Sequence, residues 1–165
     1  NTMAENEIQL ANYTLQPGYI YFAKEPTLIT TVLGSCVSVA LYDTKQKIGG
    51  MNHYRLPLPP NKNERTAVYG FPAIYKLIHL LLDNGAEKEN LTAQIFGGAI
   101  NEIYSNNEKI GEKNVEIAEK MLKKYSIKIV SKDTGGNLGR KVVFNTFTGE
   151  CIILKVEKLR RTDWL

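Results

Sequence analysis

Cys36 and His53 are the residues of this sequence whose types and spacing suggest catalysis. Cys36 follows Leu33-Gly34-Ser35, a break at which a loop enters a strand, and the glycine permits a tight bend. Backbone N–H groups at such a bend can face the sulfur, as an oxyanion hole requires. Gly34 and Ser35 are therefore candidate parts of a nucleophile corner. The alternative is that Cys36 is a small buried hydrophobe at a strand start, as free cysteines usually are.

The chain is expected to turn back so that His53 lies near Cys36. A hairpin turn near residues 43–46 places Cys36 about seven residues before the turn and His53 about seven after it, so antiparallel pairing brings them to one end of the ribbon. An imidazole beside a thiol can take its proton or stabilise the thiolate. A register slip of one residue would put the two side chains on opposite faces. A structural histidine bonded to backbone is the alternative.

The remaining candidates favour structural roles. His79 lies within a predicted helix among leucines, and Cys151 opens a strand without a histidine or glycine corner nearby in the sequence. The glycine-rich pieces 96–99 and 135–140 match neither GxGxxG nor the P-loop. We interpret them as tight turns, or as backbone that lets another chain segment approach.

The composition excludes several classes of protein. The 165 residues include 21 basic and 17 acidic side chains, a net charge of +4, with 43% hydrophobic and 23% charged residues. These values are typical of a globular domain and exclude a disordered or collagen-like chain. Two cysteines do not make a disulfide scaffold, which favours a reducing compartment. Interleaved charges argue against nucleic-acid binding, and no apolar run reaches the ~18 residues of a membrane span.

The elements that must position Cys36 and His53 follow from periodicity. Residues 1–18 are expected to be an irregular segment, and residues 19–165 a single domain. Alternating or β-branched runs predict strands at 19–22, 27–32, 36–42, 47–54, 91–96, 127–130, 141–146 and 151–156. Helical spacing predicts helices over 70–84 and 112–124. The expected class is α+β, with mixed or antiparallel sheets packed with two main helices.

Several of these segments together resemble the CheD family of chemoreceptor glutamine deamidases. The specific part is Leu33–Val39, which contains the cysteine corner, followed by Lys47–His53. The likeness continues, in order, through Tyr69-Gly70, Phe96–Ala99, Ile110–Asn114, Asp133–Gly136, Gly139-Arg140 and Thr148-Gly149. It covers residues 19–156, and it implies a catalytic core similar to that of the deamidating cysteine hydrolases of bacterial toxins.

The resemblance implies roles for individual residues. Cys36 is the nucleophile and His53 the general base. The family's third residue is a threonine six positions before the cysteine, which is Thr30 here, with Thr31 adjacent to it. The implied chemistry is acyl transfer from a glutamine side chain, with the oxyanion held by backbone N–H groups at the Ser35–Cys36 corner. No metal or organic cofactor is implied.

The resemblance also implies partners and a compartment. The substrates are methyl-accepting chemotaxis receptors, whose glutamate-rich helices suit a mildly basic protein, and glutamate methyl esters have been ascribed to the family as well. The phosphatase CheC is an implied regulatory partner, and the expected location is cytoplasmic. Two alternatives remain open: a non-catalytic adaptor that binds receptors or CheC, and a cysteine deamidase with another protein substrate.

Overall fold

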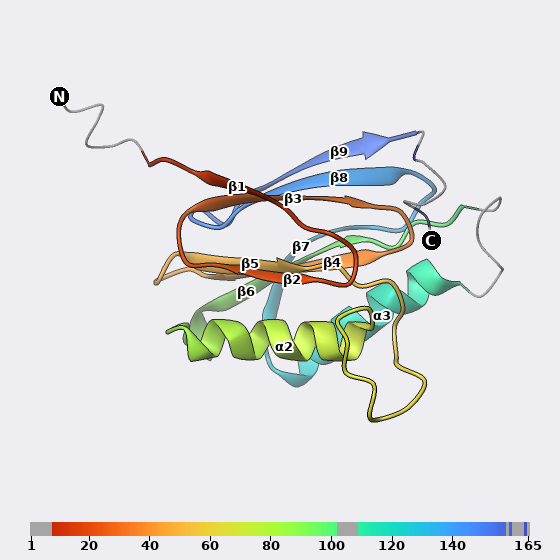
Figure 1. The fold of residues 1–165 in the computed structure, drawn as a ribbon, viewed down its shortest axis with the longest axis horizontal. Coiled ribbons are helices and arrows are strands. Elements are labelled where there is room, and N and C mark those ends of the chain that lie inside the picture. Colours follow the sequence, from red (N-terminus) through yellow and green to blue (C-terminus); the bar gives the residue numbers. More distant parts are fainter. Residues whose placement is uncertain (1–7, 102–108, 158, 160–163, 165) are drawn as a thin grey trace.

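The chain folds into two stacked β-sheets with helices covering one of them (Figure 1). This computed structural model describes residues 8–101, 109–157, 159 and 164. Within those residues, the first sheet has the strand order β1 (Ala11–Thr14), β3 (Thr27–Leu33), β8 (Gly139–Asn145), β9 (Cys151–Val156). The second sheet has the order β2 (Ile20–Ala23), β5 (Ile48–Asn52), β4 (Val37–Asp43), β6 (Leu91–Gly97), β7 (Lys128–Thr134).

Burial along the strands follows from this layering. In β3, buried and half-buried residues alternate strictly, because only one face of the first sheet is covered. In β4, all residues except Tyr42 are buried, because the second sheet lies between the first sheet and the helices. Two cores result, one between the sheets and one between the second sheet and the helices.

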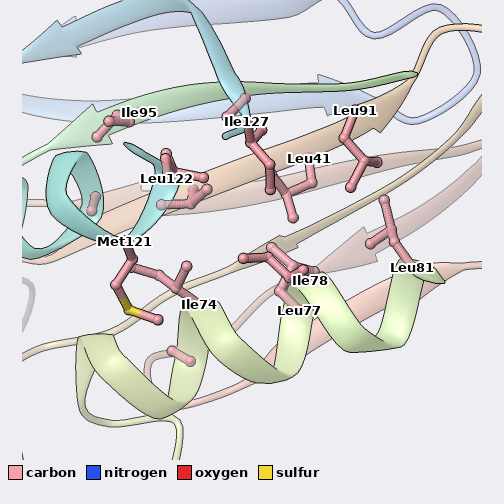
Figure 2. Packing of buried hydrophobic residues seen from close by; sticks show 14 of the residues in the cluster. Leu41, Ile74, Leu77, Ile78, Leu81, Leu91, Ile95, Met121, Leu122 and Ile127 are labelled. Atoms are coloured by element: carbon pink, nitrogen blue, oxygen red, sulfur yellow. The ribbon is translucent and has the colours of Figure 1, made fainter. Parts of the chain in front are cut away.

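Helix α2 (Gly70–Asp83) and helix α3 (Ile110–Lys124) build the second of these cores. An apolar stripe at helical spacing on α2 packs against the sheet and against α3 (Figure 2). The members of this stripe are Ile74, Leu77, Ile78 and Leu81. Helix α3 is the crossover that joins the parallel strands β6 and β7. Neither helix, of 14 and 15 residues, is long and apolar enough to cross a membrane.

Most predicted elements are confirmed, with boundaries shifted by a few residues. The hairpin turn lies between Asp43 and Ile48, which pair directly. The side chain of Asp43 accepts the backbone N–H groups of Lys45 and Gln46, each at 2.8 Å, which holds the turn. The short 3-10 helix η1 (Lys88–Asn90) was not predicted.

The prediction of an irregular segment up to residue 18 is wrong for residues 11–14. These residues form β1, which pairs in parallel with β3, and Leu15 directly after it is 2% exposed in the core between the sheets. The strand is short, and its side chains are exposed or half-buried. It therefore shows no hydrophobic alternation in the sequence, and its backbone hydrogen bonds are made with β3, so its own sequence does not indicate a strand. Residues 1–7 lie outside the described part of the chain.

Candidate active site

Cys36 lies where the chain crosses from the first sheet to the second. Strand β3 ends at Leu33 and β4 begins at Val37, so the Gly34-Ser35-Cys36 corner is the connection between the sheets. Cys36 is 3% exposed and belongs to the core between the sheets. The predicted bend before the cysteine is therefore present.

His53 follows directly after β5 and is 2% exposed. Strands β4 and β5 pair with Ala40 opposite Met51, and an isolated bridge pairs Val37 with Tyr54 in the same register. In that register Cys36 and His53 lie diagonally across the ribbon on one face. This face looks toward the first sheet, so the pairing avoids the slip that would have separated the two side chains.

Thr31 of the first sheet holds the imidazole of His53. Its Oγ1 lies 2.7 Å from His53 Nδ1 and donates its own hydrogen to the carbonyl oxygen of Leu15 at 2.9 Å. Because the hydroxyl has only one hydrogen, Oγ1 must accept from Nδ1–H. The hydrogen-bond pattern therefore assigns the proton of the neutral ring to Nδ1 and leaves the lone pair at Nε2.

The threonine that contacts His53 is Thr31 and not the predicted Thr30. Side chains alternate along β3, and Thr31 is 1% exposed on the inner face. Thr30 pairs with Val143 and is half-buried on the opposite face. Side chains at adjacent positions in a strand point to opposite faces, so only one of the two threonines can reach the imidazole. The prediction chose the threonine six positions before the cysteine, and the contact is made by the one five positions before it.

The carbonyl groups of the nucleophile corner are all held by hydrogen bonds. Those of Gly34 and Cys36 accept the N–H groups of Ala99 at 3.0 Å and Gly98 at 2.9 Å. That of Ser35 accepts the side-chain amide of Asn114 at 3.0 Å. These bonds fix the orientation of the peptide planes at the corner, and with them the directions of its N–H groups.

Other contacts at the corner were not predicted. Ser35 Oγ donates to the backbone carbonyl oxygen of Trp164 at 3.0 Å, which brings a residue near the end of the chain to the corner.

A second contact that was not predicted joins Tyr54 and Asn114. Tyr54, next to His53, donates its hydroxyl to the backbone carbonyl oxygen of Asn114 at 2.6 Å. Burial, and secondarily the nearby Cys36, raise the pKa of Tyr54 well above its usual value, so this hydroxyl stays protonated. Asn114 lies in a segment that carried the resemblance, but nothing in its local pattern indicated a site.

The glycine-rich piece at the end of β6 serves close packing, as interpreted from the sequence. Gly97 and Gly98 have φ of 106° and 71°, in the left-handed region that favours glycine. A Cβ on Gly97 would overlap the carbonyl oxygen of Cys36, and a Cβ on Gly98 would lie 2.7 Å from that of Gly111. Gly135 and Gly136 form the turn between β7 and β8, also with positive φ.

Cys151 and His79 lie apart from the corner. Burial raises the pKa of the Cys151 thiol to about 12, with a hydrogen bond from Gln94 acting in the opposite direction, so this thiol stays protonated near neutral pH. The ring of His79 packs against Tyr75 with centroids 4.3 Å apart on α2. Both positions agree with the structural interpretation.

A buried thiol and an imidazole on one face, with a hydroxyl bonded to Nδ1 of that imidazole, are the residue types of a cysteine-dependent hydrolase, here in an α+β sandwich. Residues 56–155 match the family model described as CheD chemotactic sensory transduction. Relatives align over most of the chain, and they are described as probable chemoreceptor glutamine deamidases CheD. That of Trichlorobacter lovleyi is 42% identical over 146 residues, covering 87% of this chain and 90% of the relative.

Two further relatives align over a similar share of the chain. That of Sulfurimonas denitrificans is 42% identical over 141 residues, covering 84% of this chain and 90% of its own. That of Methanococcus maripaludis is 37% identical over 145 residues, covering 87% of this chain and 94% of its own. The chain therefore belongs to the CheD family.

Proposed function

We propose that this chain is a protein-glutamine deamidase that converts glutamine side chains of chemotaxis receptors to glutamate, with Cys36 as the nucleophile. The observation that carries the proposal is the inner-face arrangement of Cys36 and His53, with Thr31 bonded to His53 Nδ1. It is supported by the name of the relatives, chemoreceptor glutamine deamidase. The lone pair at His53 Nε2 is what a general base needs in order to take the thiol proton.

The first half of the reaction forms a thioester. His53 takes the proton of the Cys36 thiol, and the sulfur attacks the side-chain carbonyl carbon of the glutamine. The tetrahedral intermediate collapses as His53 gives the proton to the amide nitrogen, which leaves as ammonia. The backbone N–H groups of the Gly34-Ser35-Cys36 corner are the proposed donors to the oxyanion, because the carbonyls of that corner are tied elsewhere.

The second half hydrolyses the thioester. His53 takes a proton from a water molecule, and the resulting hydroxide attacks the same carbon. The carbon–sulfur bond breaks, the proton returns to the Cys36 sulfur, and glutamate is released. Glutamine and water thus become glutamate and ammonia, and no electrons are exchanged with a further reagent.

Ammonia release from purified receptor fragments tests the proposal. Wild-type protein should release ammonia, with a matching mass increase at a receptor glutamine, and Cys36→Ala should release none. Cys151→Ala is the matched control, since it also removes a thiol but one that stays protonated. Release at the wild-type rate by Cys36→Ala would overturn the mechanism. Receptor binding without release by the wild type would favour the adaptor alternative.

The compartment is part of the same proposal. A nucleophilic thiol must stay reduced, and the cytoplasm is a reducing compartment, so we place the protein in the cytoplasm. Fractionation of cells that express the tagged chain tests this. Recovery in an oxidising extracellular fraction would contradict it.

A further inference from the structure

The segments that carry Cys36 and His53 are joined to each other by few backbone hydrogen bonds near the site. Regular pairing of β4 and β5 stops at Ala40 and Met51. Beyond it, the N–H of Val39 donates to the side-chain oxygen of Asn52 at 2.8 Å. The next backbone contact is the Val37–Tyr54 bridge, with bonds of 3.0 and 3.1 Å. A single bridge therefore joins the two segments directly beside the cysteine and the histidine.

Asn114 supplies a second connection on the outer side of this bridge. Its Nδ2 donates to the carbonyl oxygen of Ser35 at 3.0 Å and to that of Arg55 at 2.9 Å. Ser35 directly precedes Cys36, and Arg55 comes two residues after His53. The two hydrogens of an amide group are fixed in one plane, so the bonds set the separation and direction of both carbonyls. Asn114 is fully buried, at 0% exposure.

Asn114 is itself held in place on both sides. Its backbone carbonyl oxygen accepts a hydrogen bond from the hydroxyl of Tyr54, the residue between His53 and Arg55. It lies in the second turn of α3, and the start of this helix touches the segment that binds the corner. A Cβ on Gly111 would lie 2.5 Å from the carbonyl oxygen of Gly98, whose N–H binds the Cys36 carbonyl. Helix α3 thus contacts the corner by two routes.

We infer that Asn114 is a positioning residue for catalysis, because its side-chain amide ties the segment that carries Cys36 to the segment that carries His53. The inference deepens the proposed function and rests on it for the reaction, but not for the thiol–imidazole geometry. Asn114 is uncharged, and it bonds to one backbone carbonyl on each segment, those of Ser35 and Arg55. Its loss therefore acts on the alignment of sulfur and imidazole and on the orientation of the corner N–H groups.

The first measurement is the reactivity of the Cys36 thiol, which needs no substrate. In a Cys151→Ala background Cys36 is the remaining cysteine, and its alkylation rate by iodoacetamide is followed against pH. With the imidazole aligned, alkylation persists at neutral pH. In Asn114→Ala the profile should move toward that of an ordinary thiol, whose pKa is ~8.5, and the rate at pH 7 should fall several-fold.

The second measurement is ammonia release. In Asn114→Ala, kcat should fall by about tenfold or more while KM stays near wild type, because a small misplacement of reacting groups costs rate rather than binding. Gln94→Ala is the matched control: its amide also donates to a backbone carbonyl, that of Gly149 at 2.8 Å, away from the corner. It should lower stability and leave both the alkylation profile and kcat unchanged.

Asn114→Asp is a second variant, which keeps the test valid if Asn114→Ala does not fold. It keeps the side-chain volume, and a carboxyl group held protonated by burial retains one of the two donated bonds. Its profile and kcat should lie between those of wild type and Asn114→Ala, with rates scaled to the folded fraction from urea unfolding. A folded Asn114→Ala or Asn114→Asp with the wild-type alkylation profile overturns the inference. If the wild type releases no ammonia from receptors but Asn114→Ala still shifts the alkylation profile, the proposed function is refuted and the inference about Asn114 stands.

Discussion

At the scale of single residues, one hydrogen bond decides which ring nitrogen of neutral His53 carries the hydrogen. Thr31 donates to Leu15 and so must accept from the imidazole, which leaves Nε2 as the ring atom able to take a proton. Leu15 belongs to a segment that looked irregular in the sequence, so the orientation of a candidate base depends on backbone at the edge of the first sheet.

This predicts opposite results for two adjacent threonines. Thr31→Val keeps the shape of the side chain but leaves the buried Nδ1–H of His53 without its acceptor. Such a loss costs about 1–3 kcal/mol, so kcat/KM for ammonia release should fall by about tenfold to a hundredfold. Thr30→Val changes a half-buried position on the other face and should behave as wild type. The reverse order of the two variants would contradict the assignment.

At the scale of elements, the end of β6 shapes the nucleophile corner. Gly97 and Gly98 turn in the left-handed region, and the N–H of Gly98 and of Ala99 bind the corner carbonyls at 2.9 and 3.0 Å. The residues at the end of β6 thus donate the hydrogen bonds that hold the backbone carbonyls of Gly34 and Cys36, which lie between the two sheets.

Gly97→Ala should disturb the corner directly. Alanine there meets an unfavourable φ of 106° and overlaps the carbonyl oxygen of Cys36. We expect a loss of about 1–3 kcal/mol in the free energy of unfolding, together with slower ammonia release. Gly136→Ala is the control, because Gly136 also has a positive φ, of 68°, but a Cβ there meets nothing within 4 Å. Equal losses of activity in the two variants would show that strain alone is responsible.

At the scale of the whole molecule, the two cores keep ionisable groups in their neutral forms. Tyr54 belongs to the core beneath the helices, and Cys151 packs against the core between the sheets. Burial raises the pKa of Tyr54 well above its usual value and that of Cys151 to about 12. In both cores the folded state retains a proton that the unfolded chain gives up at lower pH.

Stability should therefore fall at alkaline pH. Below about pH 8 both groups are largely protonated in the folded and the unfolded chain. Above that, the unfolded chain loses protons first, so the free energy of unfolding falls by up to ~1.4 kcal/mol per pH unit for each group. Urea unfolding of Cys151→Ala should lack the part of the fall that begins at pH ~8.5, the ordinary thiol pKa, and keep the part above about pH 10 that comes from tyrosine. Parallel curves for the variant and the wild type would contradict this.

The local pattern of the sequence was enough to predict most elements and to predict that Cys36 and His53 lie near each other. The alternation in β3 and the helical stripe of α2 report which face is buried, because burial is repeated along an element. The turn at Asp43 placed Cys36 and His53 at one end of a ribbon, because hairpin pairing is local. Strand β1 was missed, since its partner is a strand further along the chain.

The sequence by itself determined which residue types are present and which of them share a hairpin: the cysteine after a glycine corner and the histidine that returns beside it. Only the tertiary structure decided which of two adjacent threonines faces the imidazole, and that Asn114 reaches the corner from a helix. The physical reason is that hydrogen bonds between sheets and helices depend on register and side-chain direction across long separations. A shift of one position in a strand reverses the face without changing the local sequence pattern.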